Sequence, residues 1–194
     1  MARYGKEHKE VTRRRIVNSA GRRLKKDGLD GSGVATLMAD AGLTNGAFYA
    51  HFESKDDLIA ATIADQLQQQ RILLRQLAAE PDGFTRFVHG YLSPEHRDDP
   101  EGGCPSGALL DEVARSSPAI RRAYSAGILG VADDLAALMA PDAPTAGRRE
   151  ALGYIAILVG SLQLARAIDD PQESATVLAE AIRSISALLT TTKS

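Results

Sequence analysis

Residues 34–55 read VATLMADAGLTNGAFYAHFESK, in which two short helical patterns lie on either side of a glycine. The first pattern repeats apolar residues at the i, i+3, i+4 and i+7 spacing of one helical face: Val34, Leu37, Met38 and Ala41. Gly42 follows, and glycine readily adopts the left-handed conformation that ends many helices. A second helix is predicted over 45–51, with Thr44 as its N-cap. The sequence therefore predicts a helix-turn-helix, although an ordinary helical hairpin would show the same pattern.

An aromatic run and then a charged run follow this glycine turn. The residues are Phe48-Tyr49-Ala50-His51-Phe52 and then Ser54-Lys55-Asp56-Asp57-Leu58. They closely resemble the signature of TetR-family transcriptional regulators: a glycine turn, an aromatic pair with Tyr, His-Phe, and Ser-Lys-acid-x-Leu. The resemblance covers the first third of the chain by motif and the remainder by length and helical character. It implies an all-α fold, with an N-terminal three-helix head and a helical body that binds ligand and dimerises.

The composition agrees with a helical protein of one large or two small domains. The chain has 194 residues, is 44% hydrophobic and contains no Trp, which favours helices over sheets. Its one cysteine excludes an internal disulfide and favours a reducing cytoplasm. The N-terminal sequence MARYGKEHKEV lacks the apolar stretch of a signal peptide, and no apolar run reaches the ~20 residues of a membrane span. We expect a cytoplasmic protein without membrane contact and without a cofactor.

The charge is segregated along the chain. Residues 1–26 carry ten Lys or Arg against two Glu, which makes this segment +8. Because the whole chain is −2, the remainder is −10. A solvated charged helix usually mixes both signs, whereas a basic end on an acidic body favours a polyanionic partner that meets one end only.

Nine helices are expected, with a DNA-binding head over 1–53 and a ligand-binding and dimerisation body over 54–194. The expected helical ranges are 9–26, 34–41, 45–51, 54–79, 84–92, 106–115, 118–139, 146–168 and 172–189. Ser54 is expected to cap the fourth helix, with Asp57 at its N3 position. The Pro- and Gly-rich segment 94–105 is expected to be an irregular loop, and Pro141-Asp142-Ala143-Pro144 to separate the seventh and eighth helices.

The third predicted helix carries the candidate base-reading residues. Reading DNA requires a helix in the major groove whose N-terminal side chains reach base edges. Asn45 can contact a base edge through its amide, and Ala47 can approach a thymine methyl group. Gly46 leaves little side-chain readout, so DNA shape is expected to contribute to specificity.

Phosphate contacts are expected on both sides of this helix. The resemblance implies such contacts from Thr44, Tyr49, His51 and Lys55. Arg3 and Lys6, in an arm before the first helix, can also lie along phosphates. TetR-type proteins generally carry Thr or Ser immediately before the second helix; here Gly33 occupies that place, and Ser32, one residue earlier, is expected to substitute for it. His51 can equally be a packing histidine.

The body is expected to hold a pocket for a small lipophilic effector, because its apolar helical faces offer mostly apolar walls. The candidate lining residues are Phe87, Tyr91, Cys104, Leu110, Val113, Tyr124, Ile128, Leu162 and Arg166. No catalytic set is recognisable, since a G-x-S-x-G elbow and a Gly-rich phosphate loop after a strand are both missing. The His, Asp, Glu and Cys residues over 89–104 fit no metal-ligand spacing, so neither an enzyme nor a metal site is expected.

Cys104 has two interpretations. Pro105 suits the first position of a helix, so the thiol is expected at a helix N-terminus, where the dipole favours thiolate and hence reaction with electrophiles. Some TetR-type regulators sense oxidants or electrophiles through a cysteine in the body. The acidic residues Asp98, Asp99 and Glu101 oppose a thiolate, and the alternative is a small buried apolar residue.

These features together predict a homodimeric, ligand-responsive TetR-type regulator, more specifically a repressor released from a palindromic operator by a small molecule. The resemblance implies that the last two helices form the dimer interface as a four-helix bundle. The alternative function is a helical small-molecule carrier or enzyme with an incidental head, which would leave the basic N-terminal segment unexplained.

Overall fold

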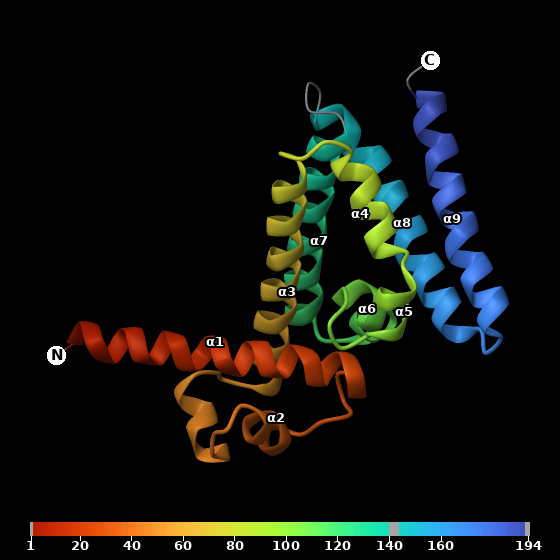
Figure 1. Cartoon of the computed structure of the whole chain (residues 1–194). Coiled ribbons are helices and arrows are strands. Elements are labelled where there is room, and N and C mark those ends of the chain that lie inside the picture. The colour runs from red at the N-terminus through yellow and green to blue at the C-terminus, as the bar shows by residue number, and fades with distance from the viewer. Residues whose placement is uncertain (1, 140–143, 193–194) are drawn as a thin grey trace.

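The computed structural model describes residues 2–139 and 144–192, with side chains described over 7–139 and 147–189. Over these ranges the chain contains helices and no strand, which confirms the all-α prediction (Figure 1). The elements are α1 Ala2–Asp27, α2 Val34–Asp40, the 3-10 helix η1 Asn45–Ala50, α3 Lys55–Leu77, α4 Gly83–Tyr91, α5 Pro94–Asp98, α6 Pro105–Arg115, α7 Pro118–Met139, α8 Pro144–Ala167 and α9 Pro171–Thr192. Within these ranges no helix is both long and apolar enough to cross a membrane.

The helices form a small head and a larger body. The head consists of α1, with α2 and η1 packed beneath it, and α3 rises from the head into the body (Figure 1). In the body, α3 packs on α7, α7 on α8, and α8 on α9. The short helices α5 and α6 lie beside the C-terminal end of α1 (Figure 1). Head and body therefore meet at two places, along α3 and at α6.

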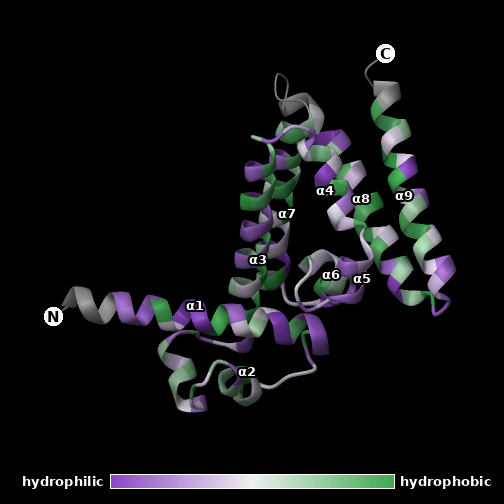
Figure 2. Cartoon of the chain, in the orientation of Figure 1, coloured by the Kyte–Doolittle hydropathy of each residue, from purple (hydrophilic) through white to green (hydrophobic). Residues whose placement is uncertain are grey.

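The head has its own buried core. The predicted apolar face of α1 is fully buried at Ile16, Ala20 and Leu24. It packs against the apolar side chains of α2 and η1, among which Leu37 is 0% and Phe48 1% exposed. Figure 2 shows this division as hydrophilic and hydrophobic bands along α1. Burial of these side chains fixes η1 on the head, at roughly 1.5–3 kcal/mol for each large one.

The turn between α2 and η1 is a Schellman motif. Gly42 has φ +67, a conformation that glycine adopts without steric cost. Its N–H donates to the Ala39 carbonyl at 2.9 Å, and the Leu43 N–H donates to the Met38 carbonyl at 2.9 Å. The turn of the predicted helix-turn-helix, residues 34–51, therefore lies at Gly42, as the sequence predicted.

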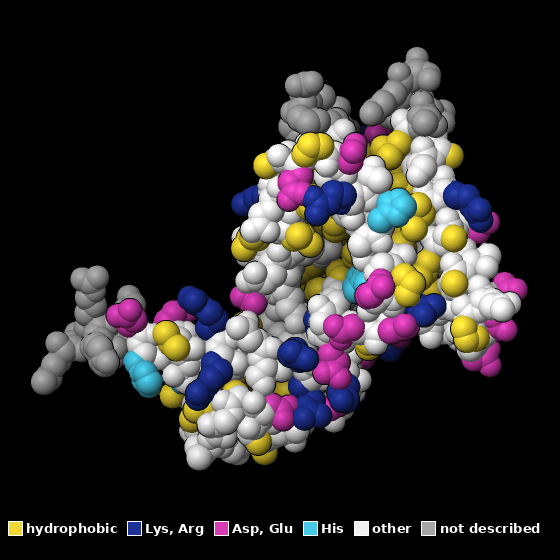
Figure 3. Space-filling model, in the orientation of Figure 1, with side chains coloured by type: hydrophobic (Ala, Val, Ile, Leu, Met, Phe, Trp, Pro, Cys, Tyr) yellow, Lys and Arg dark blue, Asp and Glu magenta, His cyan; other side chains and the backbone are white. Residues whose placement is uncertain are grey.

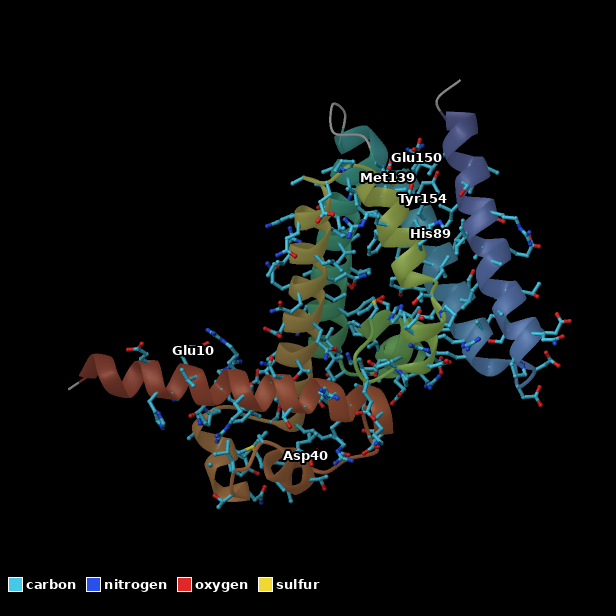
Figure 4. The ribbon with its side chains drawn as sticks, in the orientation of Figure 1. Glu10, Asp40, His89, Met139, Glu150 and Tyr154 are labelled. Carbon is cyan, nitrogen blue, oxygen red and sulfur yellow. The ribbon has the colours of Figure 1, made fainter. Side chains whose placement is uncertain are left out.

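An ion pair on the surface also joins α1 to α2. The Arg23 guanidinium donates through Nε and Nη2 to the two carboxylate oxygens of Asp40, at 2.6 and 2.9 Å. Asp40 is labelled at the end of α2 in Figure 4. The hydrogen bond from Arg23 lowers the pKa of Asp40 below its ordinary value. Since both side chains are partly exposed, this pair orients α2 more than it stabilises the fold.

Three boundary predictions were wrong. The first helix begins at Ala2, so the expected arm before it is helical. Residues 45–50 form a 3-10 helix, with the Ala47 N–H donating to the Thr44 carbonyl, because a Gly-containing segment this short gains little from α-helical bonds. The predicted loop contains α5, which starts with Pro94 at N1 and is capped by the Ser93 hydroxyl accepting from the His96 N–H at 3.2 Å.

The other helices match their predicted ranges closely. The Ser54 hydroxyl accepts from the Asp57 N–H at 3.1 Å, and the Asp57 carboxylate accepts from the Glu53 N–H at 3.2 Å, which confirms the capping-box-like start of α3. Tyr154 of α8, labelled in Figure 4, meets the Phe84 ring of α4 edge-on, with the ring centroids 5.6 Å apart. The predicted break at Pro141-Asp142-Ala143 lies outside the described residues.

Candidate functional site

The first turn of η1 forms an exposed polar surface on the head. Thr44, Asn45 and Gly46 are exposed, and Ala47 is half-buried. Tyr49 is 76% exposed, while its neighbour Phe48 is 1% exposed and packs edge-on against the Tyr49 ring at 5.2 Å. The buried Phe48 ring thus anchors η1, and η1 presents the exposed side chains to solvent. The structure brings the predicted base-reading and phosphate-binding residues of 44–49 onto one surface.

Lys55 lies at the first position of α3, beside this surface. Its Nζ is 3.7 Å from the Asp30 carboxylate, and the Asp30 side chain is fully exposed. An ion pair of this length with a solvated partner contributes little free energy. The ammonium can therefore exchange Asp30 for a phosphate without a large cost.

The environment of His51 is compatible with both of its interpretations, a phosphate ligand and a packing histidine. The residue is half-buried, and its Nδ1 atom is buried without a hydrogen-bond partner in the described part of the chain. Burial is the main cause of its lowered pKa, followed by the positive charges of Lys9 and Arg13. The imidazole is accordingly neutral at pH 7 and remains a candidate phosphate ligand and a packing histidine.

Ser32 does not occupy the place expected of it. The residue is 4% exposed, and its hydroxyl donates to the Asp27 carboxylate at 2.8 Å. The N-cap of α2 is Gly33, which has no side chain to bond the first turn. Ser32 therefore closes the loop after α1 and is not presented to a phosphate. Arg3 and Lys6 lie on the first turns of α1, outside the residues with described side chains.

A cavity of about 620 Å³ lies where α1, α3 and α4 meet the segment 102–105. Figure 3 shows the hollow between α3 and α4, with hydrophobic side chains in its wall. Its lining residues are Val17, Asn18, Lys25, Asp65, Gln66, Gln69, Gln70, Leu73, Leu77, Arg86, Phe87, Gly90, Tyr91, His96, Gly102, Gly103, Cys104 and Pro105. The wall thus includes side chains of the head, from α1, as well as of the body.

Three of the predicted pocket residues, Phe87, Tyr91 and Cys104, line this cavity. Ile128 lies behind it, around a void of about 10 Å³ that these three residues also border. The other five predicted residues do not line the cavity: Leu110, Val113, Tyr124, Leu162 and Arg166. Val113 and Leu162 are buried in the core. An apolar helical face can pack in the core or line a cavity, so the sequence pattern could not distinguish the two.

The polar members of that set are used within the chain. Arg166 donates to three backbone carbonyls, of His96 at 2.6 Å, Gly107 at 2.9 Å and Arg97 at 3.0 Å, and so ties α8 to α5 and α6. Its pKa is lowered, mainly by burial. The Tyr124 hydroxyl is bonded to that of Ser106 at 2.9 Å. These two residues stabilise the body and do not face the cavity.

The cavity is more polar than predicted, because the α3 side of its wall carries three carboxamides. Gln66, Gln69, Leu73 and Leu77 share one face of α3 with Gln70, at the i, i+3, i+4, i+7 spacing of a helix. Gln70 is half-buried, whereas its neighbours Gln68 and Gln69 are exposed. The helical spacing that identifies apolar faces would also have placed these glutamines on the face of Leu73 and Leu77.

A chain of hydrogen bonds fixes the segment around Cys104. The His96 Nδ1–H donates to the Tyr91 carbonyl at 2.7 Å, and the Nε2 atom accepts from the Cys104 N–H at 3.0 Å. Burial lowers the pKa of His96, in keeping with this neutral form. The Cys104 thiol donates to the Gln70 side-chain oxygen at 3.3 Å. Cys104 is the N-cap of α6 and Pro105 is its N1 residue, as predicted.

The candidate metal ligands of 89–104 are otherwise engaged. His96 holds the backbone at Tyr91 and Cys104, Asp98 pairs with Arg97 and Glu101 pairs with Lys26. Over the described residues, no three His, Cys, Asp or Glu side chains come together in a group that would hold a metal ion.

These features define an all-helical protein with an N-terminal helix-turn-helix head, a helical body and a cavity where the two meet. The model of the family described as bacterial regulatory proteins, tetR family, matches residues 16–62. The HTH-type transcriptional regulator TtgR of Pseudomonas putida is 33% identical over 82 residues, which are 42% of this chain and 39% of that protein. The HTH-type transcriptional regulator AcrR of Shigella flexneri is 35% identical over 60 residues, which are 31% of this chain and 28% of that protein. The match thus spans about two fifths or less of the length of these curated relatives.

Solved structures match over nearly the whole chain. A TetR transcriptional regulator from Chloroflexus aurantiacus is similar with a TM-score of 0.75 and 25% identity, over 95% of this chain and 96% of that one. Reduced NemR of E. coli shares the fold with a TM-score of 0.74 and 21% identity, over 90% of this chain and 94% of that one. Residues 16–62 thus match the TetR family in sequence, as the glycine turn and the Phe-Tyr-x-His-Phe run indicated, and the chain as a whole shares the fold of solved TetR-family regulators.

Proposed function

We propose that this protein is a sequence-specific, DNA-binding transcriptional regulator, and more specifically a repressor that a small molecule releases from a palindromic operator. The head, residues 1–53, binds DNA, and the body, residues 54–194, binds the effector and dimerises. A DNA-binding role implies a cytoplasmic protein. The observation that carries the proposal is the surface of η1, where exposed Thr44, Asn45 and Tyr49 stand on a helix anchored by buried Phe48.

The charge of the head supports DNA as its partner. The described side chains of α1 include an exposed basic series: Lys9, Arg14, Arg15, Arg22 and Lys26. Lysine and arginine side chains on a duplex release condensed counterions and provide affinity without sequence preference. Asn45 and Ala47 then supply base contacts within the major groove.

Helices α8 and α9 supply the surface for a homodimer. On α8, Leu152 is 40% and Leu164 53% exposed, and a Cβ on Gly153 or Gly160 would meet no other atom of the chain. Ala165 of α8 and Ala181 of α9 are instead buried within the chain. Each of the two helices thus has one face in the core and one exposed face with small and apolar residues, which suits a four-helix bundle with a second copy. Two heads would then meet half-sites about 34 Å or somewhat more apart.

The cavity is the candidate effector site, and Cys104 in its wall allows an electrophilic effector. As a second possibility we propose that alkylation or oxidation of this thiol releases DNA. Titration with a thiol-alkylating agent, with operator binding followed in parallel, tests it, and Cys104→Ser is the control. Rapid labelling with loss of binding only in the cysteine protein is the expected result. Labelling with DNA binding intact would leave Cys104 as a packing residue.

A mobility-shift assay against fragments of the genome that encodes the protein tests the main proposal. We expect a small set of fragments to shift at nanomolar protein and bulk DNA to compete poorly against them, since specific sites bind roughly 10³-fold or more tighter than non-specific ones. The matched control carries Asn45→Ala and Lys55→Ala together and should lose this preference. Equal binding to all fragments, or none, would favour the carrier or enzyme with an incidental head.

A further inference from the structure

Lys25 is a buried cation that forms no ion pair: burial lowers its pKa, and Asp99 acts on it only through its charge, from beyond ion-pair distance. It lies two residues before the end of α1 and is 9% exposed. Its single hydrogen bond joins Nζ to the Gly103 carbonyl at 2.6 Å, and it forms no ion pair with any described carboxylate. Lysine is almost never buried unless its charge is paired, since removing an ammonium from water costs several kcal/mol. An unpaired buried ammonium therefore calls for a counter-ion.

The same residue lines the 620 Å³ cavity. The Gly103 carbonyl occupies one of the three N–H donors of the ammonium, and two remain. The adjacent Lys26 makes a useful comparison, because its side chain is 56% exposed and pairs with Glu101 at 3.0 Å outside the cavity wall. Of these two neighbouring lysines, only the buried one lacks a carboxylate.

A second unpaired donor lies in the same wall. Tyr91 is 6% exposed, and its buried hydroxyl forms no hydrogen bond of good geometry in the described part of the chain, although the Cys104 thiol lies close to it. Burial and the neighbouring Cys104 raise the pKa of Tyr91, so the hydroxyl keeps its proton and acts as a donor. Lys25, Tyr91 and Cys104 all line the cavity, and Cys104 interacts electrostatically with both the ammonium and the hydroxyl. A carboxylate has two oxygens, and it can accept from both groups.

The remainder of the wall is suited to an apolar molecule. Leu73 and Leu77 of α3 and Phe87 of α4 line the part of the cavity away from the head. Two other charged side chains line the cavity: Arg86 pairs with Glu80, and half-buried Asp65 of α3 forms no ion pair with Lys25. Neither removes the need for an anion at Lys25.

We propose that the cavity binds an organic monocarboxylate whose carboxylate group takes the Lys25 ammonium and the Tyr91 hydroxyl and whose apolar body lies against Phe87, Leu73 and Leu77. This inference rests on the proposed function, since it names the class of effector for the cavity. Because Lys25 belongs to α1, the ligand contacts the DNA-binding head directly. It can draw the ammonium from the Gly103 carbonyl and so weaken the junction of α1 with the segment before α6.

Isothermal titration of the full chain at pH 7 without DNA, using 2-naphthoate, 2-naphthamide and 2-naphthylmethylamine, tests the inference. The three probes share one apolar body and differ in charge. We expect the carboxylate to bind about tenfold tighter than the amide, as hydrogen bonds to charged groups do, and the amine to bind most weakly. Lys25→Met should reduce the preference for carboxylate over amide to about twofold, and Tyr91→Phe should weaken carboxylate binding about fivefold. Lys26→Met is the matched control and should retain the full preference.

Every other outcome overturns the inference. Equal binding of the three probes would show that the charge of Lys25 is balanced within the chain, for example by that of Asp99. Absence of naphthoate binding at millimolar concentration, or an unchanged preference in Lys25→Met, would reject the carboxylate site. If Lys25→Met does not fold, the comparison of probes on the wild-type chain and on Tyr91→Phe decides alone. Because these titrations contain no DNA, their failure leaves the DNA-binding proposal untouched.

Discussion

The surface of the head and the cavity of the body are built in opposite ways. The candidate DNA-binding residues from Thr44 to Lys55 lie within twelve positions of sequence and are mostly exposed around one short helix. The cavity draws its wall from α1, α3, α4 and the segment 102–105, so that Val17 and Pro105 line the same space. The first site is local, and a motif reveals it. The second site exists only after the helices have packed.

This difference determines how each region tolerates change. A side chain on the η1 surface contacts solvent, so replacing it alters recognition and leaves the fold intact. A side chain of the cavity often holds backbone as well, as His96 does between Tyr91 and Cys104. Mutations on the η1 surface should therefore change DNA binding without changing stability, whereas mutations in the cavity wall should change both ligand binding and stability.

The largest effect is expected from two neighbouring residues of η1. Phe48→Ala removes a buried ring and should lower the free energy of unfolding by about 3–5 kcal/mol, with loss of DNA binding. Tyr49→Ala should change the free energy of unfolding by less than about 0.5 kcal/mol and still weaken DNA binding. Urea unfolding at one protein concentration and fluorescence anisotropy with operator DNA measure the two quantities. Equal destabilisation by both changes would contradict the division between anchor and surface.

His96 provides the corresponding change in the body. His96→Ala leaves the Tyr91 carbonyl and the Cys104 N–H without partners and should lower the free energy of unfolding by about 1–3 kcal/mol at pH 7.5. His96→Ala should also weaken ligand binding in the cavity, because His96 lines it. Phe48 does not line the cavity.

The pH dependence of stability gives this role a second measurement. Because burial lowers the pKa of His96 in the folded chain, the unfolded chain takes up its proton first, near pH 6.5. Its contribution is complete above that pH and is lost as the pH falls below about 6.5 toward the lowered pKa of the folded chain. His51 behaves alike, since its pKa is also lowered. Urea unfolding between pH 7.5 and the acid side of this range should show a shallower pH dependence in His96→Ala than in the wild type.

A specificity change is expected from Asn45→Ala. The amide of this exposed side chain is the proposed base contact, and its loss should cost about 1–3 kcal/mol at one base pair of each half-site. Selection from a randomised operator library measures the effect at each position. An unchanged preference at every position would remove Asn45 from the base-reading set.

The smallest effect should come from Lys55→Ala. Loss of a phosphate contact weakens binding to all sequences alike and makes the salt dependence shallower by about one unit. The weak pair with Asp30 that is lost with it contributes little to the fold. Affinity measured over a range of salt concentrations gives the slope. A Lys55→Ala variant that chose a different operator would assign that residue to base recognition.

The sequence predicted the head better than the body for a physical reason. The apolar spacing of α2 and the left-handed Gly42 are local features, so residues 34–51 were sufficient to place the turn. The same reasoning placed Ser54 as a cap. It missed α5, because Pro, Gly and charged residues also occur in one-turn helices, and it could not distinguish the core residue Leu162 from the cavity residue Phe87. Lys25 could not be identified at all, since its burial depends on Gly103, 78 residues away.

Helix α1 belongs to the head in sequence but also forms part of the cavity of the body. It contributes the basic surface of the head and also Val17, Asn18 and Lys25 of the cavity wall. Chimeric regulators are usually built by joining the head of one protein to the body of another between residues such as 53 and 54. Here such a fusion would transfer part of the effector site with the DNA-reading module, so a hybrid made with this body would respond to its inducer only if the incoming head carried a lysine at the position of Lys25.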